Sequence, residues 1–389
     1  MRDAVIVEAV RTPVGKGKPG GALAGIHPVE LLSHTFRALV ERSGIDPELI
    51  DDVIGGTVDQ VGEQAMNTTR YAWLGAGLPE SVPATTVDRQ CGSSQQAVHF
   101  AAQGVMAGAY DAVVACGVES MSRVPMWSNV PPGADPFGPA VAERYPGGLV
   151  PQGISAELIA AKWGIGREAM DTYATTSHQR AARAWADGLF DAEVVPIGGL
   201  ATDESVRAGT TPEVLAGLRP SFEDPAFAER FPGIEWSVTA GNSSPVNDGA
   251  SAVLITSADL AERRGLRPLA RLHSFAVTGS DPLLMLTGVL PATEKVLKRV
   301  GLRLDDIDLF EVNEAFSSVV LAWLQETGAD PAKLNVHGGA LAIGHPLGAS
   351  GTRLMTTLVH AMRARGARYG LQTMCEAGGL ANATIVEAL

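Results

Sequence analysis

The chain has 389 residues, more than the about 250 to 300 at which a single hydrophobic core stops growing, so we expect at least two packed units. Hydrophobic residues make up 46% and charged residues 19% of the sequence, a globular composition that excludes a disordered chain. The formal net charge of −13 argues against nucleic acid as the main partner, because the overall field repels phosphate groups.

The three cysteines, Cys91, Cys116 and Cys375, are too few and too widely spaced for a disulfide framework. No Cys or His spacing typical of zinc occurs, so we expect no metal site. Asp3 and Glu8 interrupt the apolar N-terminal segment, which predicts an opening strand and no signal or transit peptide. No run approaches the about 18 apolar residues of a membrane span, so we predict a cytoplasmic chain with no membrane partner.

The first 120 residues alternate short β-branched runs, at 4–7 and from Asp51, with longer helical patterns such as the one that begins at Glu30. Strands that alternate with helices are typical of βαβ units around a mainly parallel sheet. Residues 124–153 are rich in Pro and Gly and cannot sustain a helix or a central strand. We therefore expect a loop-rich insertion to begin there and the first domain to resume near Val238.

The sequence contains an internal repeat. The segment that begins at Asp51 resembles the one that begins at Asp305, and Cys91 and His345 follow these two segments at the same spacing. A turn rich in Gly or Ser and then a helical pattern follow each of them. Two similar domains explain this repeat. They place Cys91 and His345 at equivalent strand-to-helix turns, which two halves packed face to face would bring together.

Cys91 lies just before a helix, where the helix dipole and free N–H groups are expected to lower the pKa of its thiol and make it a nucleophile. The alternative is a buried cysteine that packs as a small hydrophobic residue. His345 lies in GGALAIGHPLGASG, whose glycines allow close backbone approach but match no nucleotide-binding motif. Asn313 follows a strand-like run, and it either caps the next helix or holds a water or a substrate oxygen.

Cys375 precedes a glycine-containing turn between two strands, and taken alone it is a core residue. Cys116 lies inside an apolar strand, where a cysteine is usually inert.

Together, the Cys91 segment, NEAF at 313–316, GGALAIGHPLGASG and the C-terminal Cys-x-x-Gly-Gly turn resemble the thiolases, which are acyl-CoA C-acyltransferases. The resemblance covers essentially the whole chain. The segments VDRQCGSSQQA and LQTMCEAGGLANATI are similar to degradative thiolases of actinobacteria, including some of steroid-ring breakdown.

The resemblance implies an α/β fold of two pseudo-symmetric βαβαβαββ domains in α/β/α/β/α layers, with an inserted loop domain. We place the N-terminal domain at 1–121 and 238–270, the inserted loop domain at 122–237 and the C-terminal domain at 271–389.

The resemblance also implies the site. Cys91 is then the nucleophile that takes the acyl group. His345 activates it and, with a water held by Asn313, forms one oxyanion hole. Cys375 is the acid/base for the α-proton of acetyl-CoA, and the backbone N–H groups of Cys91 and Ala377 form a second oxyanion hole.

Coenzyme A is, by the same resemblance, a substrate, and no bound cofactor is expected. The residues that the resemblance places against coenzyme A or the acyl group are Arg207, Phe222, Ser244, Gln152, Ala315 and Phe316. Pro151 and Gln152 stand where acetoacetyl-CoA specialists carry His-Met, which argues against that branch. Ala377 replaces the first Gly of the usual Cys-x-Gly-Gly-Gly turn, and we expect it at an ordinary φ, so that its N–H stays aligned.

The expected function is that of a 3-ketoacyl-CoA thiolase, which cleaves 3-ketoacyl-CoA to acetyl-CoA and acyl-CoA, or condenses them, through an acyl-cysteine. One alternative is an acetoacetyl-CoA-specific biosynthetic thiolase. Another is a non-catalytic acyl-CoA or lipid carrier of this fold, which would be expected to lose Cys91, His345 or Cys375. Two further classes are disfavoured. A decarboxylating ketoacyl synthase would need a second His at the position that Asn313 occupies, and a redox-sensing protein would need a second, resolving cysteine near Cys91. By analogy with the family we expect a homodimer or homotetramer.

Overall fold

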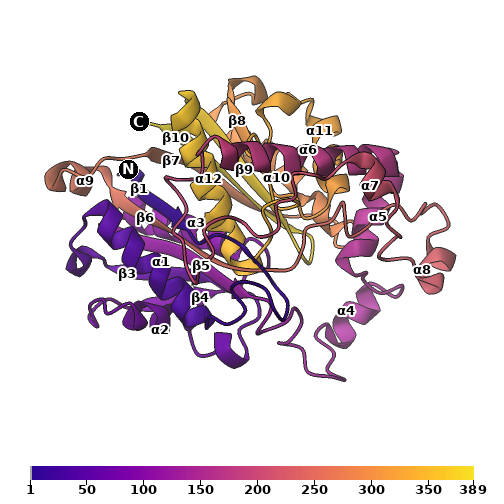
Figure 1. Cartoon of the computed structure of the whole chain (residues 1–389), viewed down its shortest axis with the longest axis horizontal. Helices are drawn as coiled ribbons and strands as arrows, with labels where there is room; N and C mark the ends of the chain where they lie inside the picture. Colours follow the sequence, from indigo (N-terminus) through magenta and orange to yellow (C-terminus); the bar gives the residue numbers. More distant parts are fainter. Residues whose placement is uncertain (1) are drawn as a thin grey trace.

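The structure, a computed structural model, describes residues 2–389, which fold around a sheet of ten strands (Figure 1). The strands are β1 (Ala4–Arg11), β2 (Gly15–Lys16), β3 (Asp52–Gly56), β4 (Ala84–Val87), β5 (Ala112–Ser120), β6 (Asn247–Ser257), β7 (Ala270–Gly279), β8 (Leu309–Val312), β9 (Tyr369–Glu376) and β10 (Leu380–Ala388). The helices are α1 (Pro28–Ser43), α2 (Thr68–Gly75), α3 (Ser93–Ala107), α4 (Gly138–Arg144), α5 (Gln152–Trp163), α6 (Arg167–Ala186), α7 (Pro212–Ala216), α8 (Pro225–Arg230), α9 (Ala258–Arg264), α10 (Val289–Val300), α11 (Ser317–Thr327) and α12 (Ser350–Arg365).

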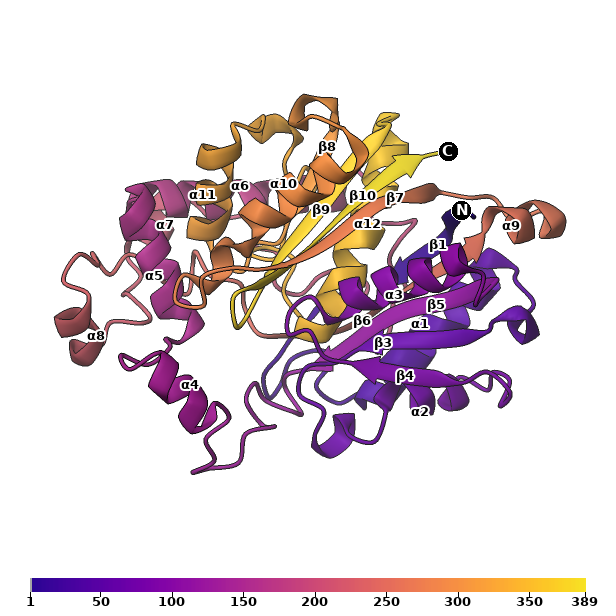
Figure 2. The same cartoon turned by 180° about the vertical axis from the view of Figure 1, so that it is seen from behind.

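The sheet consists of two similar halves, which Figure 2 shows from behind. In the first half the order is β4-β3-β5-β6-β1, with β3 parallel to β4 and β5 and with antiparallel pairs between β5, β6 and β1. In the second half β8 is parallel to β9, and β9, β10 and β7 are antiparallel in the same way. The halves join where β1 and β7 pair over Val5–Arg271 and Ile6–Ala270. The internal repeat of the sequence therefore corresponds to a repeat in the fold.

The strand expected as the counterpart of β4 in the second half is reduced to one parallel bridge between Phe310 and Leu334. The cause is Asn335, whose backbone has a positive φ of 42° and leaves the strand conformation. The Asn335 side chain makes the hydrogen bonds that a neighbouring strand would make to Val312: Oδ1 accepts from Val312 N–H at 2.9 Å, and Nδ2 donates to Val312 O at 2.9 Å. An amide side chain thus satisfies the backbone groups that a strand would have paired.

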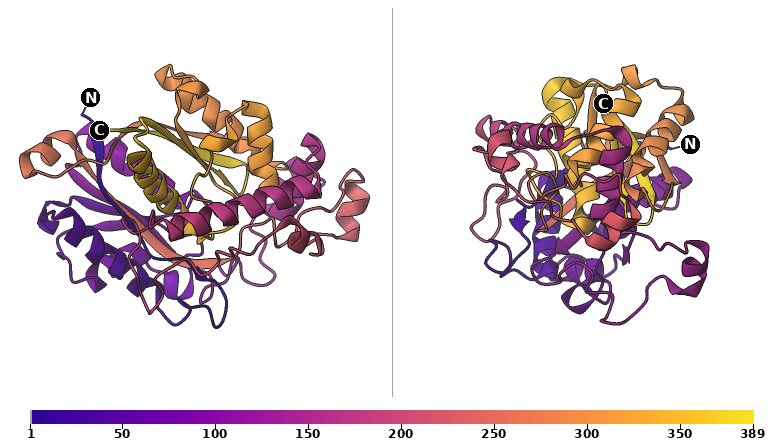
Figure 3. Two further views of the ribbon diagram at one scale, coloured as in Figure 1. Left: turned by 45° about the horizontal axis from the view of Figure 1, so that its top comes forward. Right: turned by 90° about the vertical axis from the view of Figure 1, so that its right-hand side faces the viewer.

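The helices form three layers around the two half-sheets, as expected. Helices α1 and α2 cover the outer face of the first half, and α10 covers the outer face of the second. Helices α3 and α12 pack against each other between the halves, and Figure 3 (left) shows α12 enclosed there. Twelve of the α12 positions, from Ser350 to Met362, are buried, so this helix lies in the core of the molecule.

Residues 121–246, all described, contain helices α4 to α8 and no strand of the sheet. Helices α4 and α8 extend away from the two half-sheets in Figure 1. Helix α6 packs on α11 and α5 packs on α11, which attaches this segment to the second half. The division into domains at 121, 237 and 270 stays a prediction. Within residues 2–389 no helix is both long enough and apolar enough to cross a membrane.

Candidate active site

Cys91 lies in the tight turn between β4 and α3, which begins at Ser93 with Gly92 as its N-cap. The residue before it, Gln90, has a positive φ of 50°, a conformation that costs a non-glycine residue energy and that often occurs at functional sites. The cysteine is only 5% exposed. It belongs to a small apolar cluster with Val58, Met121, Leu347, Leu354 and Met374.

Burial raises the pKa of the Cys91 thiol to about 12, and the charge of Glu376 acts in the same direction. A hydrogen bond with the Gln152 side chain lowers this pKa but does not offset the burial. The expectation that the helix N-terminus lowers the pKa was therefore wrong for the free protein, because desolvation outweighs the dipole. The thiol is protonated at neutral pH and needs a base.

His345 supplies a suitable base. Its Nδ1 lies 2.6 Å from Ser350 Oγ, whose own proton goes to Pro346 O at 2.8 Å. Nδ1 must then carry the proton that bonds Ser350, which leaves the lone pair on Nε2. Burial and, to a smaller extent, the charge of Arg353 lower the pKa of His345 to about 3. The imidazole is therefore neutral, and Nε2 carries the lone pair that can accept a proton.

Asn313 lies 3.5 Å from this nitrogen, measured from its Nδ2 to His345 Nε2. It follows β8 directly, and its N–H donates to Thr373 O on β9. The structure rules out the helix-capping interpretation, because α11 begins at Ser317 with Phe316 as its N-cap. The buried Oδ1 of Asn313 has no protein partner among the described residues, so this oxygen is available to a substrate group.

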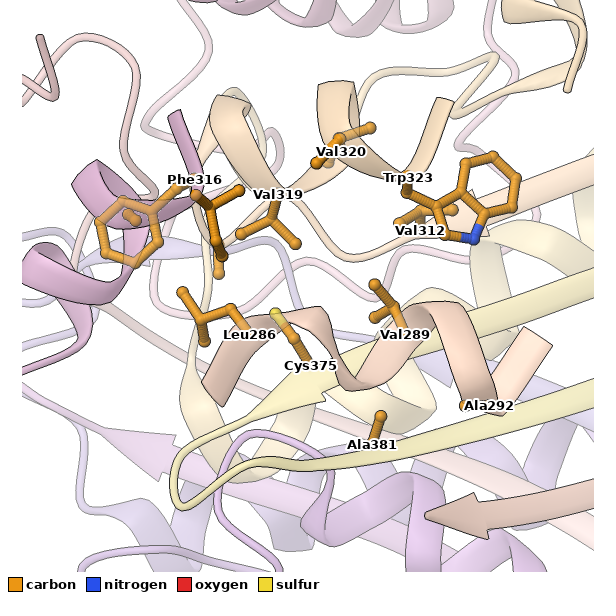
Figure 4. Packing of buried hydrophobic residues seen from close by; sticks show 14 of the residues in the cluster. Leu286, Val289, Ala292, Val312, Phe316, Val319, Val320, Trp323, Cys375 and Ala381 are labelled. Carbon is orange, nitrogen blue, oxygen red and sulfur yellow. The ribbon is translucent and has the colours of Figure 1, made fainter. Parts of the chain in front are cut away.

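Cys375 lies near the end of β9, opposite Ala381 on β10. It is fully buried, and Figure 4 shows its side chain directed toward Leu286 in the apolar cluster of the second half. Burial raises the pKa of its thiol, and the charge of a Cys91 thiolate would raise it further, which places the two thiols next to each other. Cys116, in contrast, belongs to the core of the first half.

The turn after β9 bears on the predicted second oxyanion hole. Gly378 and Gly379 have positive φ angles of 80° and 78°, whereas Ala377 is not among the non-glycine residues with a positive φ in residues 2–389. The expectation of an ordinary conformation for Ala377 is confirmed, and its N–H needs no strained backbone.

Two buried side chains that the sequence analysis missed hold the His345 loop in place. Asn247 on β6 accepts from His345 N–H at 3.0 Å. Glu119 on β5 accepts from Gly348 N–H at 2.8 Å and from the backbone N–H groups of Val58 and Asp59. Nothing in the sequence marks either residue as a ligand of that loop, because each contact spans about a hundred residues or more.

Several residues predicted to contact coenzyme A do come together. The rings of Phe222 and Phe316 are 5.9 Å apart in an edge-to-face arrangement, and a side chain at Gly153 would collide with Phe222. Ser244 N–H donates to Ala315 O at 2.9 Å. These contacts join the 220–246 segment to the start of α5 and to the NEAF segment beside the two cysteines.

Arg207 is exposed on a loop, where its N–H donates to His178 Nδ1, and among the described residues no hydrogen bond joins it to Phe222, Ser244 or the NEAF segment. A cavity of about 580 Å³ beside the Ser244 segment is lined by Leu218, Arg219, Pro220, Ser221, Glu223 and Ala240, so that it holds one basic and one acidic side chain. The sequence analysis missed Arg219, although its neighbour Phe222 was identified. The position of Arg219 close to Phe222 in the sequence is the signal that could have identified it.

The arrangement can perform acyl transfer. The turn of the buried Cys91 thiol packs against the loop of His345, since Cys91 and Leu347 share one apolar cluster, and the second buried thiol, Cys375, lies close to Cys91. The His345 imidazole is neutral, and within residues 2–389 its Nε2 accepts only the long contact from Asn313. Such a set can form a thioester at one sulfur while the other moves a proton.

Known proteins are similar to this chain along its whole length. Residues 4–259 match the family described as "Thiolase, N-terminal domain" and residues 266–388 match "Thiolase, C-terminal domain". The chain is 47% identical to the steroid 3-ketoacyl-CoA thiolase FadA6 of Mycobacterium tuberculosis, over all of this chain and 95% of that protein. It is 42% identical to a 3-ketoacyl-CoA thiolase of Bacillus subtilis over the full length of both. The acetyl-CoA acetyltransferase of Bacillus anthracis has a similar structure, with a TM-score of 0.89 and 37% identity over 100% of this chain and 99% of that one.

The turn after β9 gives a stability prediction. Since Ala377 has no positive φ, Ala377→Gly should only add freedom to the unfolded chain and lower the free energy of unfolding by about 0.4 to 1 kcal/mol. Gly378→Ala is the matched control, and at a φ of 80° it should cost roughly 1 to 2 kcal/mol. Denaturant unfolding measures both. An Ala377→Gly variant more stable than the wild type would show that the native turn is strained.

Proposed function

The chain belongs to the thiolase family, and from this premise we propose that it is a 3-ketoacyl-CoA thiolase that works through an acyl-cysteine at Cys91. It cleaves 3-ketoacyl-CoA with coenzyme A to acetyl-CoA and a shortened acyl-CoA, or runs the reverse condensation. The observation that carries the proposal is that the buried thiols of Cys91 and Cys375 lie close together at a turn that packs against the loop of the neutral His345.

In the first half-reaction, His345 Nε2 takes the proton of Cys91, and the thiolate attacks the 3-keto carbon. The carbon–carbon bond then breaks, and its electron pair forms the enolate of acetyl-CoA. Cys375 protonates this enolate and becomes a thiolate. The negative charge on the former keto oxygen faces His345 and the group that Asn313 holds, which stabilises it where it develops.

In the second half-reaction, coenzyme A enters as a thiol and gives its proton to the Cys375 thiolate. The new thiolate attacks the acyl group on Cys91, and the protonated His345 returns its proton to the departing Cys91. Every proton is back in its place after one cycle. The N–H groups of Cys91 and Ala377 are the proposed donors to the thioester oxygen, and the ordinary conformation of Ala377 supports this assignment.

Coenzyme A would enter along Phe222, Ser244, Ala315 and Phe316, which the contacts above join into one wall. Ser221, the residue before Phe222, lines the cavity at Arg219, so we assign the phosphate end of coenzyme A to Arg219, with Arg207 as the alternative from the sequence. No bound cofactor enters these steps.

Gln152 at the start of α5 bonds the Cys91 thiol and so faces the acyl group. This supports Gln152 as a determinant of acyl specificity and disfavours the acetoacetyl-CoA specialist. The name of the FadA6 relative adds steroid-derived 3-ketoacyl-CoA to the candidate substrates. The carrier alternative gains no support, since all four catalytic positions are occupied and two of them, His345 and Asn313, are in contact.

We further propose a cytoplasmic homodimer or homotetramer. The three cysteines are free thiols, which supports a reducing compartment. Strand β4 is the end strand of the sheet, and Met66 (80% exposed) and Tyr71 (48%) lie near it on and before α2. An unpaired edge beside exposed apolar side chains suits an interface with a second copy.

The variant Cys375→Ala distinguishes the proton transfer proposed for Cys375 from the one proposed for His345. We expect thiolysis of 3-ketoacyl-CoA to slow by about 10²- to 10⁴-fold, the usual loss on removing a general acid or base. Acylation of Cys91 by acyl-CoA should lose much less, because it has no carbon acid to deprotonate, and the protonated His345 can replace Cys375 as the proton donor to the departing coenzyme A thiolate. Steady-state kinetics and intact mass measure the two steps. Equal losses in both would make Cys375 a structural residue and the assigned roles wrong.

Arg219→Ala and Arg207→Ala distinguish the two candidate phosphate contacts. Loss of the contact should raise KM for coenzyme A about five- to thirtyfold, which corresponds to about 1 to 2 kcal/mol. We expect this rise for Arg219→Ala with kcat little changed, and no rise for Arg207→Ala. The opposite pattern would return the assignment to Arg207.

A further inference from the structure

Glu376 is a buried carboxyl group for which the mechanism above has no role. It follows Cys375 at the end of β9 and has no exposed surface. Neither of its carboxyl oxygens lies within hydrogen-bonding distance of a protein group in residues 2–389. An ionised carboxylate in such a place loses its hydration without compensation, which is among the costliest arrangements in a folded protein.

The carboxyl group lies against the backbone that carries the nucleophile. A Cβ atom added at Gly92 would collide with Glu376 Oε1, so Glu376 occupies the space that a side chain at Gly92 would need. Gly92 is the residue directly after Cys91. A negative charge on Glu376 would raise the pKa of both Cys91 and Cys375, which shows that the carboxyl group lies close to both sulfurs.

Few charged groups face Glu376. Arg89 and Asp88 lie on the turn before α3, and Cys91 and Cys375 are the titratable groups at α3 and on β9. Arg89 lowers the pKa of Glu376 and Asp88 raises it, but burial dominates and holds this pKa well above its ordinary value. No ion pair joins Arg89 to Glu376 among the described residues.

The nearby Glu119 shows what a buried carboxyl group needs to ionise, since burial raises its pKa to about 7 even though four hydrogen-bond donors act in the opposite direction. Glu119 accepts hydrogen bonds from Val58 N–H, Asp59 N–H, Gln64 Nε2 and Gly348 N–H. Glu376 is equally buried and has none of these. The contrast indicates that the environment of Glu376 is built for an uncharged carboxylic acid.

We propose that Glu376 is a positioning residue that acts as a neutral carboxylic acid: it fills the space between Gly92 and the two thiols, and its ionisation suppresses the Cys91 thiolate. The inference rests on the proposed function only in taking Cys91 as the nucleophile. Ionisation of Glu376 at alkaline pH would then lower the reactivity of Cys91, because a negative charge beside Cys91 disfavours the thiolate that attacks the substrate.

The test is the pH dependence of Cys91 alkylation by iodoacetamide in the intact protein, followed by peptide mapping. Glu376→Gln keeps the shape of the carboxylic acid and cannot ionise. We expect equal alkylation rates for wild type and variant at neutral pH. On the alkaline side, still below the pKa of Cys91, the variant should be alkylated about tenfold faster than the wild type at the same pH, because it carries about tenfold more thiolate.

Glu311→Gln is the matched control. Glu311 is also a buried glutamate, and burial raises its pKa to about 8, but the charged groups that act on it are Arg353, Glu314, Glu193 and Arg180, with neither Cys91 nor Cys375 among them. Its variant should reproduce the wild-type profile of Cys91. Alkylation uses no acyl-CoA, so the proposal can fail while thiolysis persists, and thiolysis can fail while the proposal holds.

Two results would overturn the proposal. Superimposable profiles for wild type and Glu376→Gln would show that no ionisation at Glu376 reaches Cys91. A variant that is slower at every pH would show that the carboxylate itself is needed. If Glu376→Gln fails to fold, Glu376→Leu replaces it, because an apolar side chain of similar size should suit a site built for a neutral group; its unfolding as well would assign Glu376 a structural ionic role.

Discussion

The close contact between α3 and α12 is the constraint on which the rest of the structure depends. Thr352 N–H donates to Ser94 Oγ at 3.0 Å near the N-termini of the two helices, and a side chain at Gly351 would collide with the backbone of Gln95. Two helices can approach so closely only where one presents a glycine. The contact brings the turn that carries Cys91 against the loop that carries His345, although the two residues lie in different halves of the fold.

Burial at this contact sets the chemistry. It raises the pKa of the Cys91 and Cys375 thiols and lowers that of His345, so that all three groups are uncharged before substrate binds. Charge then develops only during the reaction, where fixed dipoles in a region of low dielectric constant stabilise it most effectively. The one nearby carboxylate that is fully hydrogen-bonded, Glu119, holds the loop of His345 and not the reacting atoms.

The sequence was sufficient to predict those features that depend on pattern along the chain. The repeat that begins at Asp51 and Asp305 predicted the two halves, and the motifs around Cys91, Asn313, His345 and Cys375 identified the residues that the fold brings together. Features that depend on tertiary packing were out of reach. The raised pKa of Cys91 follows from an apolar cluster assembled from distant segments, and the role of Asn335 in replacing a strand follows from side-chain geometry. Glu119 and Asn247 were missed because nothing next to them in the sequence shows what they touch.

The central claim is that Cys91 alone forms the covalent intermediate, and trapping that intermediate tests it most directly. The intact protein is incubated with acyl-CoA, and its mass and its peptides are then analysed. The account predicts one acyl group per chain, attached to Cys91, with Cys116 and Cys375 unmodified. An acyl group found only on Cys375 or Cys116 would contradict it.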